Sequence, residues 1–258
     1  MKFSIIVTSY NKGQYLKDCL NSCLNQSIKD YEIIVCDNCS DDNSELIFKD
    51  YNGLIKLIKK ERISKIAAVN QIDLVKEGLK ISTGEYICLL DGDDYFQVDK
   101  LKNIKKYFYD NKNLNVIFDV PQIKINNVFY KFKLKRKYQK NIWPTIINTS
   151  SITIKSDFLK KCVENDISNN YDFLEIDFRI NVYARCIDKN YKIIPDKLTV
   201  YRRIENSIIS NIKKFSKIWW IKRLQAHEFM NQQYLKKNLK YKKNNMDYIL
   251  TKFVLNIL

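Results

Sequence analysis

The sequence is poor in the residues that interrupt regular structure and in the residue most used in catalytic triads. Its 258 residues include 5 Gly, 3 Pro and 1 His. So few Gly and Pro exclude collagen-like, linker-like and Gly-rich repeat architectures. A single His, at position 227, nearly excludes His-based triads and His-rich metal sites. We predict that His227 lies on the surface of a helix.

Motifs that bind nucleotides through glycine-rich loops are also missing. There is no G-x-x-x-x-G-K-[ST] segment, which excludes a Walker-type NTPase, and residues 10–13 contain a single Gly where a dinucleotide-binding loop has G-x-G-x-x-G. No apolar run approaches the roughly 18 residues of a membrane-spanning helix. The N-terminus leads directly into a short apolar run and not into a signal peptide. We therefore expect no transmembrane helix.

The cysteines predict a reducing environment. The chain has 7 Cys, an odd number, and without a signal peptide the natural interpretation is reduced cysteines in the cytoplasm. Cys36-Asp37-Asn38-Cys39 has C-x-x-C spacing, but no second pair stands at the distance that a zinc ribbon needs. The pattern therefore disfavours a zinc or redox role.

The residues that are abundant predict a folded and strongly basic protein. Hydrophobic residues make up 45% and charged residues 29% of the chain, a balance typical of globular proteins. The formal net charge is +16, which favours an anionic partner such as a phosphorylated substrate, an anionic lipid or a nucleic acid. Residues 211–258 contain 11 Lys and Arg against 2 Asp and Glu, a net charge of +9 out of that total.

Strand and helix patterns alternate along the chain, which predicts an α/β fold with a mostly parallel sheet and helices on both faces. In the first half, we predict strands over 3–8, 31–36, 55–58 and 86–90 and helices over 14–26, 44–51 and 67–80. In the second half, we predict strands over 116–118, 128–133, 151–154, 193–194 and 198–201 and helices over 101–109, 158–163, 172–186 and 213–237.

Acidic side chains follow two of the predicted strands at the point where each strand ends. Asp37 follows the second strand, and Asp91, Asp93 and Asp94 follow the fourth. In open α/β sheets, ligands bind in the crevice beyond the carboxyl ends of the strands. Three carboxylates in four residues repel one another unless a cation lies among them. Mg²⁺ and Mn²⁺ prefer oxygen ligands and are often shared with substrate phosphates, so the pattern predicts a metal and diphosphate site.

Two other functions fit parts of this pattern. A sugar nucleotidyltransferase also places acids beyond a parallel sheet, although it would need a Gly-rich phosphate loop after the first strand. The charge and the aromatic content also fit a nucleic-acid-binding module. The acidic cluster at 91–94 argues against a phosphate-backbone surface at that place.

Four segments follow one another at the ends and beginnings of the predicted strands. They are Thr8-Ser9-Tyr10-Asn11, Asp37 with Ser40-Asp41-Asp42, Gly84-Glu85-Tyr86 and Asp91-Gly92-Asp93-Asp94. In these four linked places the sequence resembles the family 2 glycosyltransferases, which have the GT-A fold. The similarity covers residues 1–100, with a weaker likeness up to Ser207. It implies a GT-A domain over 1–210, with a nucleotide-sugar-binding half (1–100) and an acceptor half (101–210), followed by a basic, aromatic helical tail over 211–258.

The resemblance implies an inverting, metal-dependent glycosyltransferase that uses a nucleotide-sugar, in the first place a UDP-sugar, with Mn²⁺ or Mg²⁺. Its acceptor would be a glycan or a lipid-linked glycan in the synthesis of bacterial capsule or lipooligosaccharide. Asp93 would be the main metal ligand. Asp91 would lie near the ribose and contribute to the metal site, and Asp94 would lie either near the sugar or behind the metal ligands.

The resemblance also assigns the nucleotide pocket. Thr8 and Tyr10 would line the pocket for the base, and Asp37 would accept a hydrogen bond from the pyrimidine ring. Arg62 and Lys65 would reach the nucleotide. Thr8, Tyr10 and Asp37 belong to the matching motifs, whereas Arg62 and Lys65 stand between the third strand and the acidic turn, where residues 70–84 exceed the usual spacing in the family.

A carboxylate base is expected from the second half of the chain. Inverting transfer needs one, because the acceptor hydroxyl loses its proton as its oxygen attacks the anomeric carbon. The candidates are Asp177, then Glu175, with Asp172 third; the adjacent Glu-Asp pair usual in the family is split here by Ile176. Residues two apart do not share a face of a helix, so we expect at most one of the two to point to the acceptor.

The sequence departs from the family near the end of the predicted domain. In the closing motif, residues 201–207, Ile204 stands where the family often has a His that helps to hold the metal. Arg202 or Arg203 would then supply the contact with metal or pyrophosphate.

The basic tail leaves two interpretations open. We expect residues 219–224 to pack against the core or a second subunit, and residues 236–243 to contact an anionic membrane surface or another partner. The protein would then be cytoplasmic, with peripheral association at the inner face of the cytoplasmic membrane and oligomerisation through the tail. Nucleic acid is not an expected partner.

Overall fold

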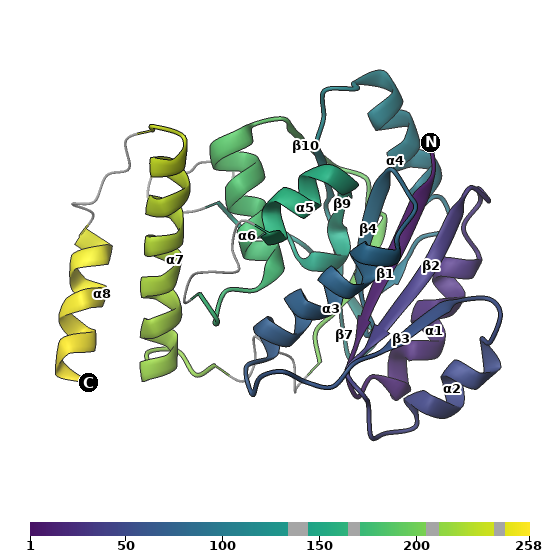
Figure 1. Ribbon diagram of the computed structural model, residues 1–258, viewed down its shortest axis with the longest axis horizontal. Helices are drawn as coiled ribbons and strands as arrows, with labels where there is room; N and C mark the ends of the chain where they lie inside the picture. The colour runs from purple at the N-terminus through teal and green to yellow at the C-terminus, as the bar shows by residue number, and fades with distance from the viewer. Residues whose placement is uncertain (134–143, 165–170, 205–211, 240–245) are drawn as a thin grey trace.

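The computed structural model describes residues 1–133, 144–164, 171–204, 212–239 and 246–258 (Figure 1). Its centre is a seven-stranded sheet in the order β10-β6-β9-β4-β1-β2-β3. Only β9 runs antiparallel to its two neighbours in this sheet, so the predicted mostly parallel sheet is confirmed. The strands are β1 (Phe3–Ser9), β2 (Tyr31–Asp37), β3 (Lys56–Lys59), β4 (Tyr86–Asp91), β6 (Val116–Asp119), β9 (Ile152–Lys155) and β10 (Tyr191–Ile194).

Helices cover both faces of the sheet, because alternate strand residues point to opposite sides. Phe3, Ile5 and Val7 of β1 belong to one core, and Ile6 belongs to the other. The first core is covered by α1 (Gly13–Leu24), α2 (Ser44–Asp50) and α4 (Lys100–Asp110), and the second by α3 (Ala67–Ile81), α5 (Ser156–Glu164) and α6 (Ile176–Val182).

A second, four-stranded sheet has the order β5-β11-β7-β8. The predicted strands over 128–133 and 198–201 are part of it, whereas β5, which has two residues, and β7 were not predicted. This sheet adjoins the acidic turn after β4, since β5 begins one residue after Asp94. Its strands are β5 (Tyr95–Phe96), β7 (Gln122–Ile125), β8 (Val128–Lys131) and β11 (Thr199–Arg202).

The tail forms two helices, α7 (Lys217–Lys236) and α8 (Met246–Ile257), which lie side by side at one end of the molecule (Figure 1). α7 packs through Phe229 and Met230 against Tyr171 and Phe178, beside α6. In the segment predicted to pack, residues 219–224, Trp220 is buried, whereas Ile218 directly before it is 46% exposed. Residues 240–243 of the predicted contact segment lie outside the described ranges.

The prediction for His227 was wrong. Its side chain is fully buried, and Nε2 lies 2.6 Å from Oδ2 of Asp247. His227 faces α8, and no helix was predicted from the sequence at that place. None of the 7 cysteines, all within the described ranges, forms a disulfide bond.

No helix in the described part of the chain combines the length and the apolar character needed to span a membrane.

Candidate active site

The ends of β1, β2 and β4 meet at the carboxyl edge of the sheet, because parallel pairing places Thr8 opposite Asp91 and Ser9 opposite Asp37. A cavity of about 400 Å³ opens there. Most of the predicted site residues line it, namely Thr8, Tyr10, Arg62, Lys65, Asp91, Asp93, Glu175 and Asp177.

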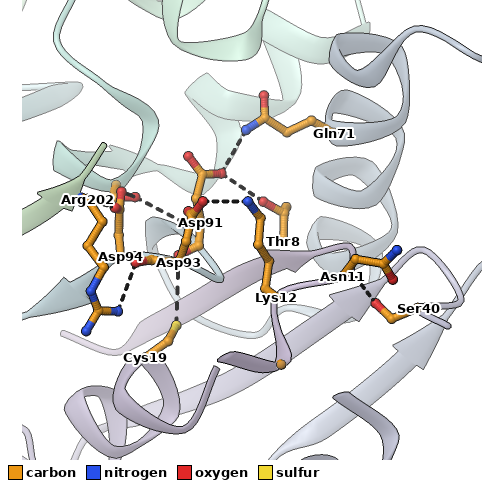
Figure 2. A network of polar contacts seen from close by, with 12 residues as sticks. Thr8, Asn11, Lys12, Cys19, Ser40, Gln71, Asp91, Asp93, Asp94 and Arg202 are labelled. Carbon is orange, nitrogen blue, oxygen red and sulfur yellow. Dashed lines mark hydrogen bonds and ion pairs between the residues drawn. The ribbon is translucent and has the colours of Figure 1, made fainter. Parts of the chain in front are cut away.

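Asp91 and Asp93 form the acidic part of the cavity (Figure 2). Oδ1 of Asp91 accepts hydrogen bonds from Thr8 Oγ1 at 3.0 Å and from Gln71 Nε2 at 2.8 Å. Burial, together with the neighbouring charge of Asp93, raises the pKa of Asp91 to about 6. Two carboxyl groups that disfavour each other's ionisation are suited to share a bound cation.

Two basic side chains contact this acidic turn, as Figure 2 shows. Nζ of Lys12 lies 2.6 Å from Oδ2 of Asp93. Arg202 donates from Nη1 to the backbone carbonyl of Asp93 at 3.0 Å, and its guanidinium is 4.6 Å from the ring centroid of Tyr95. Of the two arginines that the sequence offered, Arg202 lines the cavity, whereas the side chain of Arg203 is exposed.

Asp94 and Asp37 are buried and do not line the cavity. Asp94 accepts hydrogen bonds from Ser150 Oγ at 2.5 Å and from the backbone N–H of Arg202 at 2.7 Å, so it ties the acidic turn to β11. The carboxylate of Asp37 accepts from Ser40 through its backbone N–H at 2.7 Å and its hydroxyl at 2.6 Å. Their contacts with sugar and base stay predictions.

Tyr10, Arg62 and Lys65 also line the cavity. The guanidinium of Arg62 is 4.5 Å from the ring centroid of Tyr10, a cation–π distance. Asn38 is part of the same lining, and its Nδ2 donates to the carbonyl of Lys60 at 3.1 Å. Aromatic faces stack on bases, and cations attract phosphates, so these side chains are suited to a nucleotide.

Glu175 and Asp177 both line the cavity, which corrects the expectation that only one of them could face it. The predicted helix over 172–186 in fact begins at Ile176, and Glu175 precedes it in an extended conformation with φ −63° and ψ 159°. The rule for residues two apart holds only within a helix. The two side chains, 7% and 9% exposed, therefore share one space.

The two acids have different partners. The carboxylate of Glu175 forms an ion pair with Nζ of Lys222 on α7. Asp177 accepts at Oδ1 from the backbone N–H of Phe178 at 2.6 Å. Burial and the charge of Glu175 raise the pKa of Asp177 to about 8, although Lys222 opposes the shift. A higher pKa makes a carboxylate a stronger base, so Asp177 suits proton removal better than a carboxylate held by an ammonium.

Three polar side chains of the lining have buried atoms without a hydrogen-bond partner in the described structure. They are both amide atoms of Asn148, Oε1 of Gln71 and Oγ of Ser9. Buried polar atoms are nearly always satisfied in native proteins. These atoms therefore mark positions where a bound ligand can supply the partner.

Lys12, Gln71, Asn148 and Lys222 were missed by sequence reasoning. Lys12 stands in the same loop as Tyr10, and that proximity was a usable signal. Gln71 is a polar residue among the apolar neighbours of a buried helix, and that pattern is a weaker signal. Asn148 and Lys222 had no signal, because nothing local relates their segments to the edge of the sheet.

The acidic turn can hold a divalent cation with two carboxylates. Oδ2 of Asp91 and Oδ1 of Asp93 accept no hydrogen bond from the described residues. Within those residues, no cluster of three or more His, Cys, Asp or Glu side chains encloses a metal site. The remaining ligands of Mg²⁺ or Mn²⁺ would then be water and a substrate diphosphate, an arrangement usual for Mg²⁺.

Acids, cations and buried polar atoms without partners at the carboxyl edge of an α/β sheet are suited to a ligand that carries phosphate. The chain belongs to glycosyltransferase family 2, because the family model described as "Glycosyl transferase family 2" matches residues 4–176. The protein is therefore a glycosyltransferase, and the alternatives of a nucleotidyltransferase and of a nucleic-acid-binding module are not supported.

Curated relatives agree with this class. The chain is 32% identical over 247 residues to the uncharacterized glycosyltransferase MJ1057 of Methanocaldococcus jannaschii, covering 87% of this chain and 78% of that protein. It is 26% identical over 250 residues to the poly(ribitol-phosphate) beta-N-acetylglucosaminyltransferase TarP of Staphylococcus aureus, covering 79% of this chain and 75% of TarP.

Solved structures show the same GT-A fold. S. aureus TarS 1–349 in complex with UDP-GlcNAc has a TM-score of 0.68 at 17% identity, covering 99% of this chain and 70% of TarS 1–349. The mannosyltransferase PcManGT of Pyrobaculum calidifontis, in complex with GDP-Man and Mn²⁺, has a TM-score of 0.57 at 16% identity, covering 99% of this chain and 72% of PcManGT. The fold that the sequence motifs implied is therefore confirmed.

Proposed function

We propose that this glycosyltransferase moves a sugar, with inversion, from a nucleotide-sugar to a hydroxyl group of a glycan or lipid-linked glycan acceptor. One observation carries the proposal: a single cavity contains the acid pair Asp91 and Asp93 from the first half of the chain and the acid pair Glu175 and Asp177 from the second. The first pair is suited to bind a metal ion together with a diphosphate, and the second pair is suited to supply the general base. A displacement reaction needs both, on opposite sides of the anomeric carbon.

On the donor side, Asp93 and Asp91 would hold Mn²⁺ or Mg²⁺, which when bound neutralises the charge of a diphosphate leaving group. Tyr10 and Arg62 would contact the nucleotide in the same cavity. Lys12 lies beside Asp93 and would turn to the diphosphate once a metal ion takes that carboxylate.

On the acceptor side, Asp177 would take the proton from the acceptor hydroxyl while the hydroxyl oxygen forms its bond to the anomeric carbon. The bond from that carbon to the diphosphate oxygen breaks, and the nucleoside diphosphate leaves with the electron pair. The proton stays on Asp177. A single displacement inverts the configuration at the anomeric carbon.

The names of the related proteins support the choice of substrates. TarP is a poly(ribitol-phosphate) N-acetylglucosaminyltransferase, and the similar TarS structure contains UDP-GlcNAc. The similar mannosyltransferase contains GDP-Man and Mn²⁺. We therefore place a UDP-sugar first among the donors and a bacterial surface polymer, such as capsule or lipooligosaccharide, first among the acceptors.

A thermal-shift panel tests the donor. The purified protein is heated with UDP, GDP, CDP or their sugars, each with and without Mn²⁺. A ligand that binds the folded state raises the melting temperature by mass action, so we expect the largest rise with a UDP-sugar and Mn²⁺. Proton NMR of the product then gives the anomeric configuration. No shift with any nucleotide, or a product of retained configuration, would contradict the proposal.

The tail supports a location at the membrane surface. On α8, Met246, Ile249, Leu250 and Phe253 are all more than half exposed, and their spacing places them on one side of the helix. An apolar helix face within a basic segment suits anionic lipid. We expect sedimentation with vesicles of anionic lipid but not with neutral vesicles, and loss of it in Phe253→Asp. A dimer that Phe253→Asp dissociates would favour oligomerisation instead.

A further inference from the structure

The tail helix α7 reaches the acid pair of the active site. Nζ of Lys222 forms an ion pair with the carboxylate of Glu175, and the two side chains are 25% and 10% exposed. The cation therefore comes from residues 211–258, which the sequence analysis treated as a separate tail. Lys222 lies outside the part of the chain that the family model matches, which ends at residue 176.

The segment that precedes Glu175 is fixed to the same helix. The backbone N–H of Phe173 donates to Oε1 of Gln225 at 2.9 Å. The ring of Phe229 packs against Tyr171, with ring centroids 5.6 Å apart. Both contacts lie on the C-terminal side of Lys222, three and seven residues further along α7, and they hold this part of the helix against the segment that precedes Glu175. The ion pair is thus part of a packed interface and not a contact between two flexible surface side chains.

The charges around Asp177 come from several elements. Glu175 lies before α6, Lys222 on α7, Asp91 at the end of β4 and Tyr201 on β11. Two buried carboxyl groups lie beside one ammonium group, so only one of them is held by a cation. Because Lys222 contacts Glu175, the carboxyl group left without a cation is Asp177.

We propose that Lys222 is a positioning residue for the transfer reaction: by holding Glu175 as the carboxylate of an ion pair, it leaves Asp177 as the group that takes the proton of the acceptor hydroxyl. The inference rests on the proposed function. It assigns the roles of the two acids, and it makes α7 a structural part of the active site. Glu175 acts through its charge, and Asp177 acts on the substrate.

Opposite substitutions give opposite predictions. Lys222→Met removes a positive charge near Asp177, so its deprotonation moves to higher pH. Glu175→Gln removes a negative charge, so the deprotonation moves to lower pH. A change of about one pH unit is usual for the loss of a neighbouring charge. Lys222→Arg keeps the charge, and the double variant Lys222→Met/Glu175→Gln removes both charges and falls between the singles.

The first measurement is the pH dependence of kcat/KM for transfer. We expect the rising limb to move up by about one unit in Lys222→Met and down by about one unit in Glu175→Gln. At pH 7 the rate of Lys222→Met falls about tenfold, with little change in KM for the donor, and Lys222→Arg recovers most of it. Lys217→Met removes an exposed lysine of the same helix and serves as the matched control, with an unchanged profile.

The second measurement does not need activity. Carboxyl carbon NMR of the donor-free protein in EDTA follows Asp177, assigned by the resonance that disappears in Asp177→Asn. The midpoint of the Asp177 titration should move to higher pH in Lys222→Met and to lower pH in Glu175→Gln. An equal loss of rate at every pH in both single variants, or an Asp177 resonance that moves in neither, would overturn the inference. A wild-type protein that transfers no sugar while Asp177 titrates as expected would refute the proposed function alone.

Discussion

Nζ of Lys12 lies 2.6 Å from Oδ2 of Asp93, so the main predicted metal ligand is already paired with a cation from the protein itself. The pair lies in the donor cavity, and a divalent cation must displace Lys12 to use that oxygen. Metal binding is therefore coupled to the release of an ammonium group, which then lies close to the place proposed for the diphosphate.

This coupling predicts the behaviour of Lys12→Ala. Without Lys12, Asp93 and Asp91 repel each other with no internal cation, so added Mn²⁺ should raise the melting temperature more than it does in the wild type. Transfer should fall at least tenfold, because the diphosphate loses a cation. The control is Lys17→Ala, an exposed lysine in α1, the helix that begins directly after Lys12. An equal response of the variant and the wild type to Mn²⁺ would show that Lys12 does not compete with the metal.

The unpaired amide of Asn148 predicts that its removal weakens ligand binding without lowering the stability of the protein. Its amide atoms are buried without partners, so Asn148→Ala should leave the melting temperature unchanged or raise it. The variant should bind a nucleotide-sugar about 10- to 100-fold more weakly, since a buried hydrogen bond to a ligand contributes about 1–3 kcal/mol. Calorimetry measures the affinity, and Asn113→Ala in an exposed turn is the control. Full affinity in Asn148→Ala would mean that its amide faces no ligand.

The raised pKa of Asp177 predicts a pH-dependent stability. The pKa is about 8 in the folded protein and about 3.9 in an unfolded chain, so the folded state holds an extra proton between these values. This group's contribution to stability is complete below pH ~4 and is lost as the pH rises to about 8. Asp177→Asn removes the titrating group. Its melting temperature, relative to wild type, should therefore rise between pH 5 and 8.

The control for this experiment is Asp99→Asn, an exposed acid that lies 3.8 Å from Lys102. The difference in melting temperature between Asp99→Asn and the wild type should stay nearly constant between pH 5 and 8. A constant difference for Asp177→Asn as well would show that Asp177 ionises like an ordinary surface acid.

A buried ion pair beneath the site predicts a large loss of stability. Nζ of Lys100 lies 2.8 Å from Oδ1 of Asp119, and both side chains are fully buried. Lys100 also donates to the carbonyl of Ser150, whose hydroxyl bonds Asp94. Lys100→Met leaves Asp119 without its cation, and we expect a loss of about 3–5 kcal/mol in denaturant unfolding. Lys102→Met, on the exposed side of the same helix, should change stability by less than about 0.5 kcal/mol.

The double variant Lys100→Met/Asp119→Leu separates charge from packing. Removing both buried charges should recover much of the loss, because no uncompensated carboxylate remains. If the double variant is as unstable as Lys100→Met, the lost contacts are those of packing and not of the ion pair.

The first half of the fold was predictable because its signals are local. Each apolar run between polar turns became a strand, and the acids at 91–94 followed a strand as expected. Gly84 illustrates the same point: a Cβ there would lie 2.5 Å from the backbone N of Ser4, so the motif before β4 reflects a close approach of two strands. A position with no room for a side chain requires Gly, and such a residue can be recognised in the sequence.

The second half was less predictable because its arrangement depends on distant residues. Nothing in residues 152–155 indicates that β9 inserts antiparallel between β4 and β6. Asp94 is turned away from the cavity by hydrogen bonds to residues 56 and 108 positions away. The late start of α6 at Ile176 brings Glu175 and Asp177 together, and Lys222 reaches them through helix packing that periodicity cannot show.

The account depends on a metal ion at the acidic turn that binds the donor's diphosphate. Isothermal titration of UDP-GlcNAc, or of whichever nucleotide-sugar the panel identifies, into wild type and Asp93→Asn, each with and without Mn²⁺, tests it most directly. We predict that tight binding requires both Mn²⁺ and Asp93, with a loss of at least tenfold in affinity when either is absent. Equal affinity in all four titrations would contradict the account.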